Sequence, residues 1–333
     1  MIVEIIPCLS DNYSYLIHEK ETGTVSIVDP SEFNACDKII NKYKKLDFIL
    51  NTHHHADHVG ANLEFKKKYN SKILGSHADK NRIPGIDILL KENQKHKIGN
   101  LEFEVIFIPG HTKGHIAFFF KKEKIAFTGD TLFSLGCGRV FEGTHEEMFN
   151  SLNKIKNLPL DTKIYCGHEY TNSNLNFCLK HDPKNTHLKD KKIDIEKKLN
   201  SNQPTIPSTI ADEIKTNIFL RCDDPEIKQG LGLKDSSDAE VFSKFSSGKS
   251  EYTLYYEDQP SGLPRWESDT ISQFDIALGA SIGQKWVNKI GWTFEINFGV
   301  GRFITNNQTD DYNGYYNRPE ATVKGGLSIG KRF

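Results

Sequence analysis

A cluster of histidine and aspartate residues directly behind an apolar run is the feature that most constrains this chain. The segment from Asn51 to Gly60 reads NTHHHADHVG and follows the run LDFIL. In an extended segment His53 and His55 point the same way, while Asp57 and His58 begin the next helix. Imidazoles and a carboxylate suit zinc, and also iron or manganese at similar sites. A histidine tract alone is often a solvated loop or an adventitious metal binder, so this segment by itself leaves both interpretations open.

Three further candidate ligands each follow an apolar, strand-like run. His111 follows EVIFIPG, Asp130 follows KIAFTG and His168 follows KIYCG. Functional groups gather at the carboxyl ends of strands in α/β sheets. A single histidine after a strand is more often a structural residue, but the complete set in this order is not expected by accident. We therefore expect four strand ends to bring seven ligands to one edge.

The periodicity of the 333-residue chain changes twice. Up to about Tyr170, short β-branched runs alternate with amphipathic stretches, which predicts an α/β layer protein. Helices are expected within residues 35–44, 59–69 and 145–156. Lysine-rich helical stretches follow, with Ser208 and Ser237 at plausible helix starts. We predict a catalytic domain at 1–171, a helical substrate-binding domain at 172–248 and a β-rich extension of unknown role at 249–333.

The carboxyl-terminal segment differs from the rest of the chain in composition. It holds all three tryptophans, many tyrosines and glycines, and no cysteine. Its alternation of period two and its terminal Phe333 resemble the closing strands of a bacterial outer-membrane β-barrel. Three or four strands cannot close such a barrel, whose smallest forms need about eight. We expect an accessory sheet or a fused fragment without its own catalytic role.

Charge and cysteine usage exclude several classes of protein. The formal net charge of −1 gives no bulk attraction for nucleic acid or an anionic membrane. The six cysteines form no Cys-x-x-Cys pair, which favours reduced thiols. The amino terminus lacks a signal-peptide pattern, and no run approaches the roughly 20 apolar residues of a membrane helix. We expect a cytoplasmic monomer with no nucleic-acid or membrane partner.

The order and context of the seven ligands resemble those of the metallo-β-lactamase superfamily. The motifs CGRVFEGT at 137–144, YCGHEYT at 165–171 and PTIPST at 204–209 are similar to those of glyoxalase II, the hydroxyacylglutathione hydrolases. The resemblance covers about residues 1–244 and implies an αββα sandwich followed by a small helical domain. It also implies hydrolysis of S-D-lactoylglutathione, or a related acyl-glutathione, to D-lactate and glutathione in methylglyoxal detoxification.

Carried over by position, the resemblance implies two metal ions, expected to be zinc with iron or manganese as alternatives. One ion is expected on His53, His55 and His111, and the other on Asp57, His58 and His168, with Asp130 bridging both. A centre about 3.5 to 4 Å across can share a carboxylate and activate water near neutral pH. Asp57 and Asp130 are the expected catalytic carboxylates. A thiolate leaves readily, so no strong general acid is required.

Other polar residues carry weaker signals. Asp29 ends another apolar run and is the candidate hydrogen-bond partner of a ligand histidine, although a turn before Pro30 explains it equally well. The remaining histidines of this region are interpreted as ordinary surface or packing residues. They are His54, His77, His115 and His145.

The substrate-binding residues depart from the family pattern. Arg139, Tyr170 and Lys249 match residues that hold glutathione in the family. Phe141 replaces the usual tyrosine, and Ser246 lies where a terminal arginine is expected. One lost charge-assisted hydrogen bond costs roughly 1.5 to 3 kcal/mol, or about ten- to a hundredfold in affinity. We therefore expect metal chemistry with weakened glutathione binding.

Two alternatives remain on the sequence alone. The first is another enzyme on the same scaffold, such as a persulfide dioxygenase with one iron or a lactonase. The second is a non-catalytic, envelope-associated protein defined by its β-rich tail. The complete ligand set argues against the second alternative, because an inactive scaffold has no physical need for all seven side chains.

Overall fold

The computed structural model describes the backbone of residues 1–252, 277–287, 292–303 and 321–331, and the side chains of residues 1–247. The chain divides into two compact units, Met1–Gln259 and Pro260–Phe333. This division places the α/β part and the helical part together. The predicted boundary at residue 171 therefore stays a prediction.

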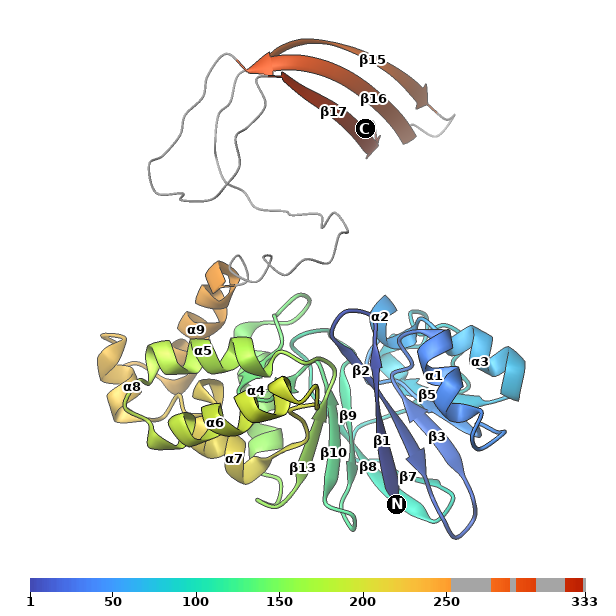
Figure 1. The fold of residues 1–333 in the computed structure, drawn as a ribbon, viewed down its shortest axis with the longest axis vertical. Helices are drawn as coiled ribbons and strands as arrows, with labels where there is room; N and C mark the ends of the chain where they lie inside the picture. The colour runs from blue at the N-terminus through green and yellow to red at the C-terminus, as the bar shows by residue number, and fades with distance from the viewer. Residues whose placement is uncertain (253–276, 288–291, 304–320, 332–333) are drawn as a thin grey trace. The chain divides into compact units, whose positions relative to one another are not determined.

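Two six-stranded sheets form the centre of the first unit (Figure 1). The first sheet has the order β1 (Ile2–Cys8), β2 (Asn12–His18), β3 (Val25–Val28), β4 (Phe48–Leu50), β5 (Lys72–Ser76) and β6 (Ile88–Leu90). The second has the order β14 (Ser208–Thr209), β13 (Lys163–Cys166), β10 (Ile125–Gly129), β9 (Ile116–Phe120), β8 (Leu101–Phe107) and β7 (Lys95–Ile98). A small hairpin joins β11 (Leu132–Phe133) to β12 (Gly136–Cys137).

Helices cover the outer faces of both sheets (Figure 1). Those of the first sheet are α1 (Phe33–Ile40), α2 (Ala56–Val59), α3 (Asn62–Tyr69) and η1 (His77–Asp79). Those on the side of the second sheet are α4 (His145–Lys156), α5 (Thr171–His181), α6 (Thr186–Asn200), α7 (Ile210–Thr216), η2 (Ile218–Leu220), α8 (Pro225–Gly230) and α9 (Asp238–Tyr252). Within the described residues, no helix combines the length and the apolar character that crossing a membrane demands.

Three hydrophobic clusters fill the spaces between these layers. One joins side chains of both sheets, such as Tyr15 and Phe118. A second joins the first sheet to its helices through residues such as Phe65. The third joins the second sheet to α4 and the helical region. Each sheet is therefore buried on both faces, which explains why its strands read as continuous apolar runs. The predicted αββα sandwich with an added helical region is confirmed.

The local patterns predicted most elements and misplaced a few boundaries. The apolar runs LDFIL, EVIFIPG, KIAFTG and KIYCG form β4, β8, β10 and β13, and the helix at 145–156 has the predicted bounds. The helix expected at 59–69 is interrupted after Val59, where a side chain in place of Gly60 would come within 2.4 Å of a backbone oxygen. Ser208 lies in β14, and Thr209 instead caps α7. Ser237 exchanges backbone and side-chain hydrogen bonds with Glu240 at the start of α9, as predicted.

The second unit contains one antiparallel sheet of three described strands. They are β15 (Ala277–Val287), β16 (Trp292–Phe303) and β17 (Ala321–Lys331), in that spatial order. The alternation of period two in the carboxyl-terminal segment therefore corresponds to strands at the described residues. The role of this sheet stays a prediction.

Glu213 of α7 is hydrogen-bonded to the β11–β12 hairpin and has a raised pKa. Its Oε2 accepts hydrogen bonds from Leu135 N and Asn217 Nδ2, both at 2.9 Å. Burial raises the pKa of this carboxyl from 4.5 to about 6. The folded state thus binds the proton of Glu213 more tightly than the unfolded state does. The unfolding free energy gained in this way is fully present below about pH 4.5 and is lost as the pH rises through 6.

Replacing this carboxyl is expected to remove that pH dependence. Wild-type protein should lose about 2 kcal/mol of unfolding free energy between acidic and neutral pH through this group. Glu213→Gln keeps an oxygen for both donors and should gain stability over wild type at neutral pH. Urea unfolding at several pH values measures the difference, with the exposed Glu196→Gln as control. Parallel pH profiles of Glu213→Gln and wild type would contradict this assignment.

Candidate metal centre

The seven predicted ligands meet at one edge of the sandwich. His53, His55, Asp57 and His58 follow β4 of the first sheet, while His111, Asp130 and His168 follow β8, β10 and β13 of the second. Strands β8, β10 and β13 run in the same direction, so their carboxyl ends share this edge. The side chains form two groups, each of which draws on both sheets. These groups are His53, His55 and His111, and Asp57, His58 and His168.

Within each group the potential ligand atoms lie within 4.8 Å of one another. In the first group, His55 Nδ1 lies 3.0 Å from His111 Nε2. In the second, Asp57 Oδ2 lies 3.5 Å from His58 Nε2 and 3.4 Å from His168 Nε2. Separations of 3 to 3.5 Å suit atoms that share one cation about 2 Å away from each.

Asp130 lies between the two groups. Its Oδ2 is 3.4 Å from His111 Nε2 and 3.2 Å from His168 Nε2, and its Oδ1 is 3.4 Å from His58 Nε2. One carboxylate therefore contacts a histidine of the first group and two histidines of the second. This is the geometry expected of a bridging ligand.

Several ligand atoms are buried without a hydrogen-bond partner. They include His53 Nε2, His58 Nε2 and Asp130 Oδ1. Buried polar atoms normally have a partner, since leaving one unsatisfied costs roughly 1 to 3 kcal/mol. His53 belongs to the first group and His58 to the second, with Asp130 between them, so a cation in each group would give all three atoms a partner. The donor set of imidazole nitrogens and carboxylate oxygens fits zinc and similar transition metals.

The second nitrogen of four histidines is already occupied. His58 Nδ1 donates to Asp29 Oδ2 at 3.1 Å, His168 Nδ1 to Asp11 Oδ1 at 2.7 Å, and His111 Nδ1 to the backbone oxygen of Arg139 at 2.9 Å. The Thr52 hydroxyl donates to Asp29 Oδ2, so it accepts from His53 Nδ1 at 3.1 Å. These bonds place the proton on Nδ1 and leave each Nε2 with a lone pair for a metal.

The electrostatics of the centre favour cation binding. Burial lowers the pKa of His53 well below its ordinary value and that of His55 to about 4, so both imidazoles are neutral. Burial alone would raise the pKa of Asp130, but the neighbouring His168 and His58 outweigh it and hold this pKa well below its ordinary value. Against the effect of burial, Asp130 and Asp11 raise the pKa of His168 to about 9. The second group thus lies in a field that attracts positive charge.

Gly167 allows the backbone of one turn to pass directly over the Asp130 carboxylate. A Cβ atom at this position would lie 2.2 Å from Asp130 Oδ1 and 2.8 Å from His58 Cε1. Any side chain would displace both groups. The glycine of the YCGHEYT motif is therefore required by close packing against Asp130.

Several residues that the sequence alone did not identify contact the candidate ligands. Asp11 binds His168, and Asn12 donates from Nδ2 to Asp57 Oδ2 at 3.0 Å. His115, interpreted as an ordinary residue, is fully buried, stacks on His53 at 4.6 Å and accepts a hydrogen bond from Asp130 N at 3.1 Å. A polar turn behind the first strand was the available signal for Asp11 and Asn12. His115, four residues after a ligand, offered no such signal.

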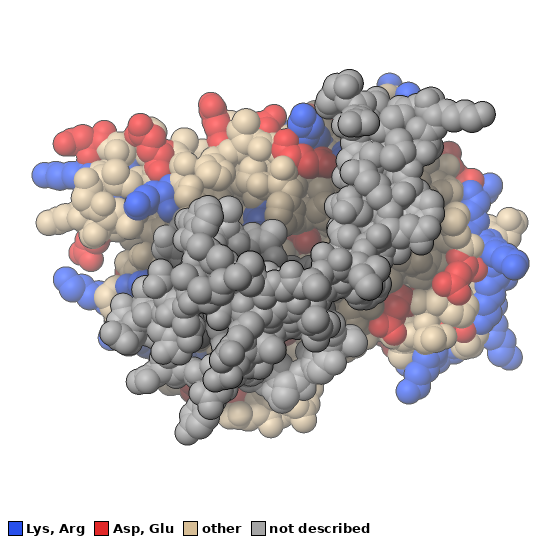
Figure 2. Space-filling model, turned by 90° about the horizontal axis from the view of Figure 1, so that it is seen from above, with Lys and Arg blue, Asp and Glu red and all other residues tan. Residues whose placement is uncertain are grey.

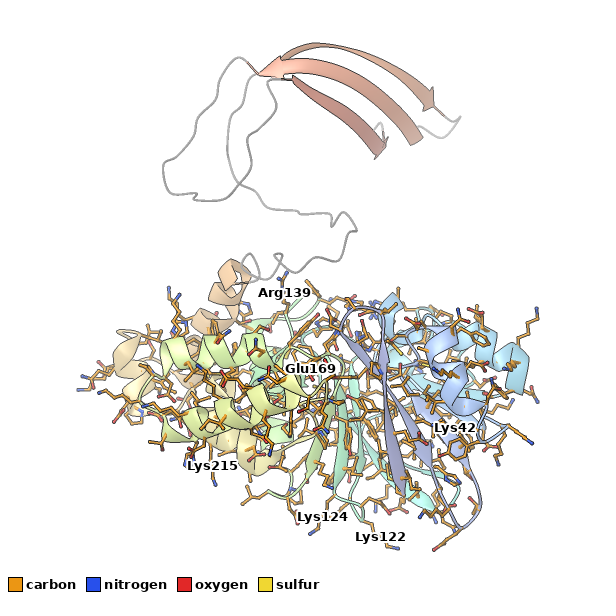
Figure 3. The ribbon with its side chains drawn as sticks, viewed as in Figure 1. Lys42, Lys122, Lys124, Arg139, Glu169 and Lys215 are labelled. Carbon is orange, nitrogen blue, oxygen red and sulfur yellow. The ribbon has the colours of Figure 1, made fainter. Side chains whose placement is uncertain are left out.

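The candidate substrate residues surround the same edge. The Phe141 ring is 62% exposed and lies 6.0 Å from the His55 ring and 5.1 Å from the His111 ring. Tyr170 stacks on His168 with ring centroids 4.8 Å apart. Arg139 is exposed, and Figure 3 places it at the edge that also carries α2. The side chain of Lys249 lies outside the described residues.

Charges of both signs are distributed around this edge. In Figure 2, Lys and Arg side chains and Asp and Glu side chains both appear on the part of the described surface that the view leaves uncovered. This distribution agrees with the formal net charge of −1.

Two family models match consecutive parts of the chain. The model of the metallo-beta-lactamase superfamily matches residues 10–168, which hold all seven ligands. The model of the hydroxyacylglutathione hydrolase C-terminus matches residues 169–252, which include α5 to α9. The two matches meet directly after His168.

Curated relatives and solved structures agree with this assignment. The hydroxyacylglutathione hydrolase of Pelagibacter ubique is 54% identical over 222 residues, covering 66% of this chain and 93% of the relative. The hydroxyacylglutathione hydrolase of Chelativorans sp. is 45% identical over 251 residues, which cover 74% of this chain and 97% of the relative. Among solved structures, ETHE1 from Myxococcus xanthus has a TM-score of 0.52 at 22% identity, covers 75% of this chain and 98% of that one, and supports the fold alone. With its ligand set and both family regions in sequence order, the chain belongs to the hydroxyacylglutathione hydrolase, or glyoxalase II, family of the metallo-β-lactamase superfamily.

Proposed function

We propose that this protein hydrolyses the thioester of S-D-lactoylglutathione, or a related acyl-glutathione, to D-lactate and glutathione. The observation that carries the proposal is the pair of ligand groups joined by Asp130. The name shared by the curated relatives supports this activity over a persulfide dioxygenase or a lactonase. It also argues against a non-catalytic envelope protein. The proposed partner is a small glutathione thioester bound by a monomer.

The proposal includes two zinc ions, one in each ligand group. His53, His55 and His111 would hold the first, Asp57, His58 and His168 the second, and Asp130 both. When bound, the ions supply Lewis acidity and make water ionisable near neutral pH. Sharing of Asp130 is supported by the distances of its two oxygens from histidines of both groups.

The carboxylates have different roles in this proposal. Asp130 is buried and orients the histidines of both groups, so it sets the geometry of the centre. The Asp57 side chain is 38% exposed and its Oδ2 accepts from Asn12 at 3.0 Å, which holds the carboxylate toward the second group. With its partly exposed carboxylate, Asp57 would accept a proton from the attacking water. The thiolate of glutathione leaves without a strong general acid.

The substrate would lie over the edge bordered by Phe141 and Tyr170. The ring of Tyr170, parallel to that of His168, would bring a phenol close to the second group. Arg139 and Lys249 are proposed to supply positive charge for the carboxylates of glutathione. The exposed ring of Phe141 offers an apolar surface where the family pattern has a hydroxyl.

A thioesterase assay on metal-analysed protein tests the proposed function. We expect hydrolysis of S-D-lactoylglutathione by protein that contains two metal ions per chain, and loss of activity after chelation. One iron per chain together with oxygen consumption would instead support the dioxygenase. No hydrolysis of any acyl-glutathione by fully metallated protein would exclude the proposal.

Restoring the missing hydroxyl is expected to tighten substrate binding. Phe141→Tyr should lower KM about tenfold with little change in kcat, because one hydrogen bond to a charged group is worth roughly 1.5 to 3 kcal/mol. Steady-state kinetics on the same metal-analysed preparation measures the effect. Phe141→Leu, which changes the ring but adds no hydroxyl, serves as control. An unchanged KM in Phe141→Tyr would place the substrate elsewhere.

A further inference from the structure

A second group of charged side chains lies beside the candidate metal centre. Arg82 donates to Asp79 Oδ1 from Nη2 at 2.5 Å and from Nε at 3.1 Å. Its Nη1 donates to Glu142 Oε1 at 2.5 Å and lies 3.3 Å from His54 Nε2. One planar guanidinium therefore joins two carboxylates and a histidine, a geometry that lysine cannot reproduce.

The partners of Arg82 come from different loops at the ligand edge. His54 lies between two candidate ligands in the turn after β4, and Asp79 ends η1. Glu142 directly follows Phe141, and its Oε2 accepts from Lys113 N at 2.8 Å. Lys113 is itself two residues after His111. Arg82 and Glu142 thus tie the loop that carries Phe141 to both loops that supply the first ligand group.

Burial of Asp79 holds Arg82 in place. The Asp79 side chain is fully buried, and its Oδ2 lies 3.4 Å from His54 Nδ1. The chain packs so tightly against it that a Cβ atom at Gly114 would lie 2.1 Å from Asp79 Oδ1. A buried carboxylate is costly unless a cation pairs with it, so the guanidinium is constrained by its buried side and presents Nη1 to Glu142.

The outer side of this network borders an open hollow of 510 Å³ lined by Ala78, Arg82, Lys113 and Glu142. The Arg82–Glu142 pair is therefore partly exposed, and its contribution to global stability is modest. Its position next to Phe141 gives it a local effect on the substrate edge.

We propose that Arg82 is a positioning residue for the substrate. By clamping Glu142 to the metal-ligand turn at His54, it holds Phe141 over the rings of His55 and His111. This inference rests on the proposed function, because Phe141 is assigned there to the substrate edge. Arg82 acts through Glu142 and does not touch the reacting atoms.

Glu142→Gln and Arg82→Lys test the clamp without leaving Asp79 unpaired. Both should raise KM about tenfold while kcat and metal content stay close to wild type. Hydrogen exchange of residues 138–144 should accelerate in both variants, because the Gly143 N–H bond to Gly110 O, at 3.0 Å, loses its support. The double variant should raise KM no further than the single variants, since both changes break one interaction.

Lys66→Ala is a matched control. Lys66 pairs with Asp87 at 2.8 Å, with side chains 33% and 22% exposed, against 35% and 27% for Arg82 and Glu142. The Lys66→Ala variant should leave KM and the hydrogen exchange of residues 138–144 unchanged.

Unchanged exchange at 138–144 in Glu142→Gln and Arg82→Lys, or additive KM effects in the double variant, would overturn the clamp. Should wild-type protein fail to hydrolyse acyl-glutathione, the proposed function falls, but the exchange comparison still decides whether Arg82 anchors the loop.

Discussion

Asp130→Ala is expected to lower kcat by about a thousandfold or more, because two-metal centres contribute several kcal/mol to the reaction and each 1.4 kcal/mol is a factor of ten. Asp130 is the only candidate ligand with oxygens near histidines of both groups, at 3.2 to 3.4 Å. Its removal leaves those imidazoles without their shared negative charge. Metal content should fall with activity.

Elemental analysis and steady-state kinetics on the same preparation measure both effects. Asp161→Ala is the control. It removes an exposed carboxylate that pairs with Lys124, and Lys124 lies at the opposite end of β10 from Asp130. Asp130→Asn separates charge from shape, and we expect it to lose most of the activity while keeping the fold. Asp130→Ala protein with wild-type metal content and kcat within tenfold would contradict the bridging role.

Asp29→Ala is expected to lower metal affinity about ten- to a hundredfold, as is usual for residues that orient a metal ligand. Its Oδ1 accepts from Thr52 N at 2.8 Å, and its Oδ2 accepts from Thr52 Oγ1 at 2.6 Å and from His58 Nδ1 at 3.1 Å. A single buried carboxylate therefore supports one ligand directly and His53 through the threonine. Its loss leaves three buried donors unsatisfied, which also lowers the free energy of unfolding.

Competition with a chromophoric chelator measures the metal affinity, and chemical unfolding measures the stability. Asp29 has a φ of 47°, a backbone conformation that asparagine also tolerates. Asp29→Asn therefore keeps the backbone and isolates the effect of the charge. We expect it to weaken metal binding with a smaller loss of stability than Asp29→Ala. Wild-type affinity in both variants would restrict Asp29 to a turn residue before Pro30.

The strands and ligands were predictable because their signals are local. Each ligand follows an apolar run by a few residues, and the direction of a strand determines where its carboxyl end lies. β2 is not marked by a continuous apolar run, although it is almost wholly buried. It contains Asn12 and Ser14, polar residues whose burial depends on bonds to Asp57 and to the backbone of Asp29. Such bonds have no local pattern.

The supporting residues of the site were less predictable for the same reason. Asp11 and His168 are separated by 157 residues, and Arg82 and Glu142 by 60. Neither pair belongs to a short motif, and only the packed fold brings its members together. Asp29 was identifiable because it ends an apolar run, and the fold shows which histidine it supports. Local patterns predicted strands in the tryptophan-rich carboxyl-terminal segment but did not predict its role.

The dual origin of each ligand group links cation binding to the distance between the two sheets. Each group takes two side chains from the segment after β4 and one from the opposite sheet, so a shift of either sheet would change the distances between the side chains of both groups. Aromatic side chains such as Phe118 and Phe127 set the spacing of the layers from well below the edge. A change in the volume of these aromatic side chains would alter the spacing of the two sheets, and with it the size of cation that the two groups fit.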